Sequence, residues 1–172
     1  MKKLVVLILA CTTFGLAQVN AQAIEKGNSL ITLQVGLAGT FAVSGADTSI
    51  SPTLTYEYAV MDQLTVGAFG SYASAEYEYP NYTWKWTYIF AGAVGNYHFV
   101  NTDKFDVYAG ARLGFISVSF DDDGTGLPDP SSGGFGYVAQ VGARYFFTPN
   151  IALNAEVGYG FTIARAGVTF QF

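Results

Sequence analysis

The single histidine of the chain is the first residue whose chemistry suggests catalysis. His98 lies between Tyr97 and Phe99. An imidazole acts as a general base when a nucleophile and an orienting acid lie within hydrogen-bond reach. The sequence suggests no such triad around His98, and a lone histidine at a segment end is more often a hydrogen-bonded structural residue. We therefore expect no catalytic residues and no enzyme.

A run of aspartates is the one candidate for a metal site. Asp121, Asp123 and Asp129 carry carboxylates, and alternate oxygen donors at Asp121, Asp123 and Thr125 suit Ca²⁺. The run lacks the bidentate glutamate and the spacing of an EF-hand. A solvated acidic loop is the favoured interpretation, so we expect neither a metal nor another cofactor.

Alternation of apolar with small or polar residues, with a period of two, predicts strands along the chain from residue 29 onward. In the first segment, for example, Ile31, Leu33 and Val35 share one face, and Thr32 and Gln34 share the other. Eight segments alternate in this way: Ser29–Val43, Ile50–Val60, Leu64–Ala75, Trp86–Phe99, Phe105–Phe120, Phe135–Phe147, Ile151–Gly160 and Ala164–Phe172.

Five charged residues fall on the small or polar face of these segments: Glu57, Arg112, Arg144, Glu156 and Arg165. Counting from the turn around Pro149 places Glu156 nearly opposite Gly142 and diagonal to Arg144. A tight last hairpin would also place Glu156 diagonal to Arg165, with Arg112 level across Gly142. This arrangement predicts a structural ion-pair network, and a charged constriction that selects ions is the less favoured alternative.

The first residues have the features of an export signal. Lys2 and Lys3 precede a short apolar run, and Ala21-Gln22-Ala23 offers cleavage after Ala21 or after Ala23. The predicted organisation is a signal in residues 1–21 and one domain in residues 22–172. Cys11, the only cysteine, gives a weak likeness to a lipoprotein acylation site, and we expect it to be removed with the signal.

The composition favours a membrane protein built of strands. Only 12% of the residues are charged, against a typical ~25%, and aromatic residues make up 16% of the chain. No apolar run after the signal is long enough for a membrane helix, so a closed barrel is the remaining way to satisfy the backbone in lipid. The net charge of −5 and the lack of a basic stripe argue against nucleic acid as a partner.

Aromatic pairs mark one rim of the predicted barrel. Several segments end in an aromatic-x-aromatic pair beside a short turn, as an interfacial girdle requires. The short turns are Val60–Gln63, Val100–Lys104 and Thr148–Asn150, whereas Glu76–Lys85 and Asp121–Gly134 form longer connections on the opposite side. The expected girdle residues are Tyr56, Tyr58, Tyr97, Phe99, Tyr145, Phe147, Phe170 and Phe172.

The terminal strand and these rim pairs resemble the small bacterial outer-membrane β-barrel domain family, which includes OmpX-like proteins and the membrane domain of OmpA-like proteins. A strand that ends in Phe172 is similar to the signal by which such proteins are recognised for insertion. The resemblance implies an all-β, eight-stranded, antiparallel up-and-down transmembrane barrel in the bacterial outer membrane. Its implied partners are outer-membrane lipid, lipopolysaccharide and, during insertion, the barrel-assembly machinery. We expect a monomer.

Three functions are compatible with this resemblance. The favoured one is a non-enzymatic protein that supports envelope integrity or presents surface loops for adhesion or binding. The first alternative is a narrow channel for ions or small solutes. The second is a lipid-modifying enzyme, but lipid A deacylases of this architecture carry a serine two residues after the histidine, where this chain has Val100.

Overall fold

Strands make up nearly all of the regular structure in the computed structural model, which describes residues 22–38, 47–48, 50–79, 82–122 and 131–172. They are β1 (Ser29–Ala38), β2 (Asp47–Thr48), β3 (Ile50–Met61), β4 (Leu64–Tyr79), β5 (Tyr82–Asn101), β6 (Phe105–Asp122), β7 (Ser131–Thr148), β8 (Ile151–Gly160) and β9 (Thr162–Gln171). The last residues of the first predicted segment, 39–43, lie outside the described residues. Within the described ranges, no helix is long and apolar enough to cross a membrane.

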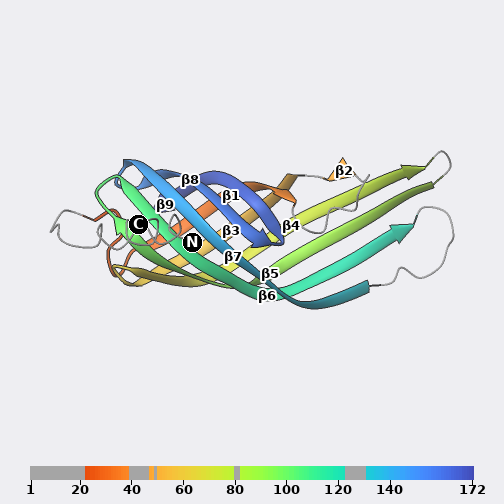
Figure 1. The fold of residues 1–172 in the computed structure, drawn as a ribbon, viewed down its shortest axis with the longest axis horizontal. Helices are drawn as coiled ribbons and strands as arrows, with labels where there is room; N and C mark the ends of the chain where they lie inside the picture. The colour runs from red at the N-terminus through yellow and green to blue at the C-terminus, as the bar shows by residue number, and fades with distance from the viewer. Residues whose placement is uncertain (1–21, 39–46, 49, 80–81, 123–130) are drawn as a thin grey trace, which may run out of the picture.

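All the strands except the short β2 form one closed antiparallel barrel (Figure 1). From β3 to β9 each strand pairs with the next in sequence, and β1 closes the ring between β3 and β9. At the seam, Phe172 N–H donates to Ser29 O at 3.0 Å, and Ser29 N–H donates to Phe172 O at 2.8 Å. The predicted eight-stranded up-and-down architecture is confirmed.

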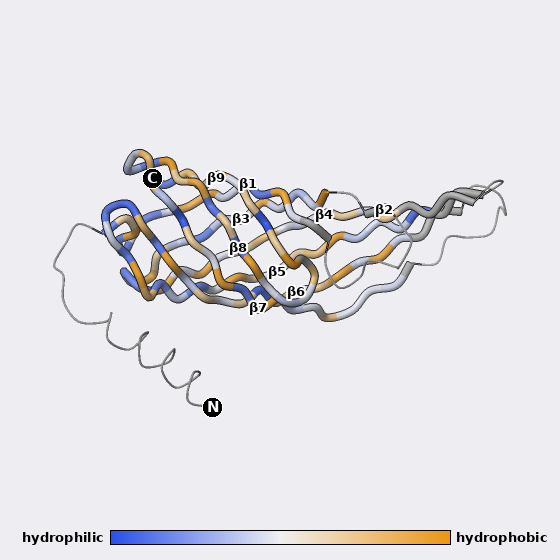
Figure 2. Tube along the Cα trace, turned by 45° about the horizontal axis from the view of Figure 1, so that its top comes forward, coloured by the Kyte–Doolittle hydropathy of each residue, from blue (hydrophilic) through white to orange (hydrophobic). Residues whose placement is uncertain are grey.

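The two faces of the barrel wall follow from the two-residue period. In β3 and in the first part of β8, exposed and buried residues alternate along the strand. The resulting alternation of apolar and polar residues is visible along the tube in Figure 2. Leucines such as Leu33 and Leu54 face outward and are 53% exposed, whereas Thr32 and Thr55 face inward and are buried. The outer surface is therefore apolar, as lipid contact requires.

The two ends of the barrel differ. At one end, called the short-turn end, only residues 62–63, 102–104 and 149–150 separate successive strands, which confirms the predicted short turns. At the other end β4, β5, β6 and β7 continue past the ring as a sheet (Figure 1), which we call the extension. Pairing continues to Tyr79↔Tyr82 between β4 and β5, and to Ser119↔Ser131 between β6 and β7.

The extension corrects the prediction that Glu76–Lys85 and Asp121–Gly134 are loops. Residues 76–79, 82–85, 121–122 and 131–134 of these two connections are strand. Turn-forming residues such as Pro80 and Asn81 suggested a long loop, but the tyrosine, threonine and tryptophan residues beside them favour paired strands.

Candidate functional site

The barrel interior brings the charged strand residues together. Each of the five is at least 95% buried: Glu57, Arg112, Arg144, Glu156 and Arg165. They come from β3, β6, β7, β8 and β9, so the network ties together strands from around the ring. The contacts divide them into two clusters, one centred on Arg144 and the other on Glu156.

The Arg144 cluster lies toward the short-turn end and contains more acid than base. Arg144 forms an ion pair with Glu57 and a second one, at 3.1 Å, with Asp106. Glu57 also accepts hydrogen bonds from Thr65 at 2.7 Å and from the Asn96 amide at 2.5 Å. These donors stabilise a carboxylate that has lost its contact with water.

His98 belongs to the same cluster. Its Nδ1 lies 2.6 Å from Asp106 Oδ1, and its Nε2 lies 3.0 Å from Thr65 Oγ1. His98 thus links a hydroxyl and a carboxylate, an arrangement that was not expected from the sequence. No local pattern indicated this contact, because Thr65 lies 33 positions before His98.

Burial separates this arrangement from a working triad. Thr65, His98 and Asp106 are each at least 99% buried, and Thr65 gives its one hydroxyl hydrogen to Glu57. A nucleophile needs room for a substrate carbonyl beside it. None of the three residues lines the pockets described below. The geometry therefore supports a structural hydrogen-bond chain.

The Glu156 cluster lies next to the first and contains more base than acid. Arg165 Nε donates to Glu156 at 2.9 Å, and Arg112 lies 3.3 Å from the same carboxylate. Gln140 Oε1 accepts from both arginines, at 2.7 Å from Arg112 and at 2.8 Å from Arg165. One carboxylate and one amide oxygen thus hold two guanidinium groups side by side.

Tyr108 and Asn96 connect the two clusters. The Tyr108 hydroxyl donates to Glu156 at 2.7 Å, and the Arg144 guanidinium lies 4.4 Å from the centre of the Tyr108 ring. Gln140 donates to Asn96 at 2.8 Å. The clusters therefore form one continuous polar layer across the barrel.

The strand register differs in part from the prediction. Glu156 does lie opposite Gly142, but Arg165 is directly opposite Glu156 rather than diagonal to it. In the pairing of β6 with β7, Tyr108 rather than Arg112 lies opposite Gly142. Arg112 lies opposite Val138. A two-residue turn fixes the register between β7 and β8, whereas the long hairpin between β6 and β7 leaves it free in the sequence.

Asp106 and Tyr108 were missed among the interior residues. Their signal was present in the sequence, because they share the even-numbered face of β6 with Arg112. Gly142 makes room for Tyr108, since a Cβ at that position would lie 2.5 Å from the tyrosine hydroxyl. The phenol thus occupies space that the sequence interpretation assigned to arginine.

Apolar side chains close the barrel on both sides of the polar layer. The inner apolar layer, at the short-turn end, consists of Ala23, Ile24, Leu30, Ala59, Phe146 and Ala152. The outer apolar layer, toward the extension, consists of Phe69, Ala73, Phe90, Val94, Val138 and Phe161. In the outer layer the Phe90 ring contacts Phe69 and Phe161, with ring centres 4.7 and 5.2 Å apart.

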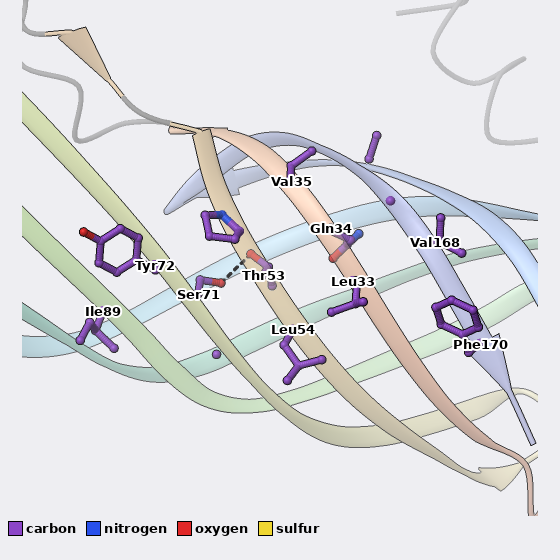
Figure 3. Close-up of a pocket in the computed structure, with 14 residues that line it drawn as sticks. Leu33, Gln34, Val35, Thr53, Leu54, Ser71, Tyr72, Ile89, Val168 and Phe170 are labelled. Carbon is purple, nitrogen blue, oxygen red and sulfur yellow. Dashed lines mark hydrogen bonds between the residues drawn. The ribbon is translucent and has the colours of Figure 1, made fainter.

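The outer surface carries the aromatic residues expected in a girdle. All eight are exposed: Tyr56, Tyr58, Tyr97, Phe99, Tyr145, Phe147, Phe170 and Phe172. A shallow apolar groove crosses the outer face of β1, β3, β4 and β9, where Figure 3 shows Leu33, Leu54 and Val168 along it. Its place on the apolar wall fits contact with lipid tails.

The aspartate run cannot be placed as a site. Asp123 and Asp129 lie outside the described residues, and only the backbone of Asp121, at the end of β6, is described. Elsewhere in the described part of the chain, no group of three or more histidine, cysteine, aspartate or glutamate residues is arranged to hold a metal ion.

Comparisons with known proteins agree with this architecture. Residues 7–171 match the family model described as outer membrane protein beta-barrel domain. No curated protein matches the chain by sequence.

Solved structures with similar folds are bacterial outer-membrane barrels. The N-terminal β-barrel domain of Pseudomonas aeruginosa OprF has 16% identity and a TM-score of 0.58, over 86% of this chain and 98% of that one. P. aeruginosa OprG has 14% identity and a TM-score of 0.58, over 88% and 99%. Yersinia pestis Ail, in complex with the heparin analogue sucrose octasulfate, has 15% identity and a TM-score of 0.52, over 86% and 99%.

Proposed function

We propose that this chain, which belongs to the outer membrane protein beta-barrel domain family, is a closed, non-enzymatic anchor in the bacterial outer membrane that presents its extension for binding. The family places the barrel in the outer membrane. Short turns face the periplasm in such barrels and longer connections face outside. The extension then points away from the cell.

The filled interior is the observation that carries the proposal. An eight-stranded barrel is only just wide enough for side chains to fill it. In this one, three arginines and three acids are cross-linked by ion pairs and hydrogen bonds: Glu57, Asp106, Arg112, Arg144, Glu156 and Arg165. Opening a path for ions would require several of these buried pairs to separate.

The two apolar layers argue further against the channel alternative. An ion that entered from either side would meet Ile24 or Phe90, both fully buried, before it reached the polar layer. Apolar constrictions exclude water as well as ions. Two apolar layers in series would therefore block a continuous water path through the barrel.

The extension supports the binding part of the proposal. On the side away from β6, β7 pairs with β8 only as far as Val138↔Gly160, so Ser131–Tyr137 has no partner strand there among the described residues. An unpaired edge can accept an extended peptide as an added strand. The net charge of −5 disfavours a sulfated polyanion like the ligand in the Ail structure.

Removal of the extension tests this function. In the variant, residues 74–87 and 115–135 are each replaced by a short turn, which removes most of the Ser131–Tyr137 edge and leaves the interior clusters intact. Cells that express it should lose attachment to one another and to protein-coated surfaces, while resistance to detergent stays as in the wild type. Loss of resistance with unchanged attachment would instead favour a role in envelope integrity.

A further inference from the structure

Residues 22–28 close the short-turn end of the barrel. Ile24 is completely buried in the inner apolar layer, where it clusters with Leu30, Ala59 and Phe146. Ala23, just before it, is 92% buried. This segment directly follows the first of the two possible cleavage positions, so the position of the cut decides how much of it remains.

Hydrogen bonds hold Ala23 and Ile24 in place through their backbone atoms. Ala23 N–H donates to Thr102 O at 3.1 Å, and Ala23 O accepts from Gln171 Nε2 at 2.6 Å. Ile24 makes a reciprocal pair with the Asn101 side chain, with Ile24 N 3.1 Å from Oδ1 and Ile24 O 2.6 Å from Nδ2. Both residues are thus integrated into the barrel end.

The two cuts have different structural consequences. Cleavage after Ala23 would remove the partner of Gln171 Nε2 and of Thr102 O, and would turn the buried Ile24 nitrogen into an ammonium. Burial of an ammonium with a single neutral acceptor is costly. Cleavage after Ala21 keeps every one of these bonds and places the new ammonium on Gln22.

A pocket beside Gln22 suits an ammonium. It has a volume of about 350 Å³, and its lining includes Gln22, Glu25, Asp103, Lys104 and Gln171. Gln171 is 92% buried, and its side-chain Oε1 has no hydrogen-bond partner among the described residues. Two carboxylates and one free acceptor outweigh the single Lys104 cation, so the pocket can accept the hydrogens of an amino terminus.

We propose that the export signal is removed between Ala21 and Gln22, and that Ala23 and Ile24, near the start of the mature chain, plug the short-turn end of the barrel. Hydrolysis adds one water across the Ala21–Gln22 amide. Ala21 leaves with a carboxylate, and Gln22 keeps the amino group, which is protonated at neutral pH and lies at the pocket.

Amino-terminal sequencing and intact mass of protein purified from outer membranes test the proposal. We expect the mature chain to begin at Gln22. A mature chain that begins at Ile24, or at any other residue, overturns the proposal.

A matched pair of variants makes the test independent of how well the plug folds. Signal cleavage requires a small residue directly before the cut. Ala21→Leu should therefore accumulate precursor, whereas Ala23→Leu should still be cut before Gln22. The reverse pattern, with Ala23→Leu blocking processing, contradicts the proposed site.

Discussion

The two interior clusters use the same kinds of groups in opposite proportions. Arg144 stands between two carboxylates, Glu57 and Asp106, whereas Glu156 stands between two guanidinium groups, Arg112 and Arg165. Apart from His98, the first cluster holds two carboxylates and one guanidinium group, whereas the second holds one carboxylate and two guanidinium groups. Together the two clusters contain three carboxylates and three guanidinium groups, and Tyr108 contacts both clusters.

We expect the central residue of each cluster to contribute more to stability than its flanking residues do. Removal of Arg144 takes the shared guanidinium group away from two buried carboxylates, Glu57 and Asp106. Removal of a flanking residue such as Arg165 leaves Glu156 with Arg112 and Tyr108 as partners. Removal of one partner of a buried ion pair typically lowers the free energy of unfolding by ~3–5 kcal/mol, because the other charge stays buried without a partner.

The largest effect is therefore expected for Arg144→Met. We predict a loss of about 3–5 kcal/mol in the free energy of unfolding, measured by urea titration in lipid vesicles. The matched variant Arg165→Met should lose clearly less. Equal losses in the two variants would remove the distinction between central and flanking residues.

An arginine introduced on the outer wall should also destabilise the barrel, because that wall faces lipid. Val141 is exposed on β7, one position from the buried Gln140. Val141→Arg should lower stability by ~2–4 kcal/mol if this position lies near the bilayer midplane. Val141→Leu is the control, and the readout is the fraction folded into liposomes. Wild-type folding of Val141→Arg would mean that this face does not contact lipid.

A smaller loss is expected for Thr65→Val, which keeps the shape of the side chain and removes the hydroxyl. Both Glu57 and His98 lose a partner, so we expect a cost of about 1–3 kcal/mol. If the hydroxyl has only this structural role, the lipid A mass profile of cells that express the variant should match that of cells with the wild type. A lipid change seen with wild type and lost with Thr65→Val would make the Thr65–His98–Asp106 line catalytic.

The sequence predicts which charged residues face the interior, but it does not predict which of them form ion pairs. Alternation placed the five charges on one face, because a two-residue period assigns every side chain to a side. It could not determine that Arg144 pairs with Glu57, which lies 87 positions away and across the barrel. Such a contact depends on ring closure and on side-chain length.

The strand lengths were likewise predictable at only one end of the barrel. Tight turns such as 149–150 are marked by residues that break strands, so that end of the barrel was predictable. At the other end Pro80 suggested a long loop, yet β4 continues to Tyr79 and β5 begins at Tyr82. A turn residue marks where the chain reverses, whereas pairing with neighbouring strands decides how far the strands extend.

The smallest expected effect is the coupling between substitutions, which tests how the clusters are divided. Glu156→Gln combined with Arg165→Met should deviate from additivity by at least about 0.5 kcal/mol, because the two side chains form an ion pair. Glu156→Gln combined with Arg144→Met should be closer to additive, since Tyr108 lies between them. The free energies come from the same urea titrations. A larger coupling to Arg144 than to Arg165 would show that the two clusters act as one.

Conductance in planar bilayers tests most directly whether the barrel is closed. The wild-type protein should show no regular single-channel steps, whereas the double variant Phe90→Ala with Arg112→Ala, which thins the outer apolar layer and loosens the Glu156 cluster, should leak more often. Folding of both proteins is checked first by their resistance to protease in the same lipid. A stable, ion-selective conductance in the wild type would contradict the account and support a channel.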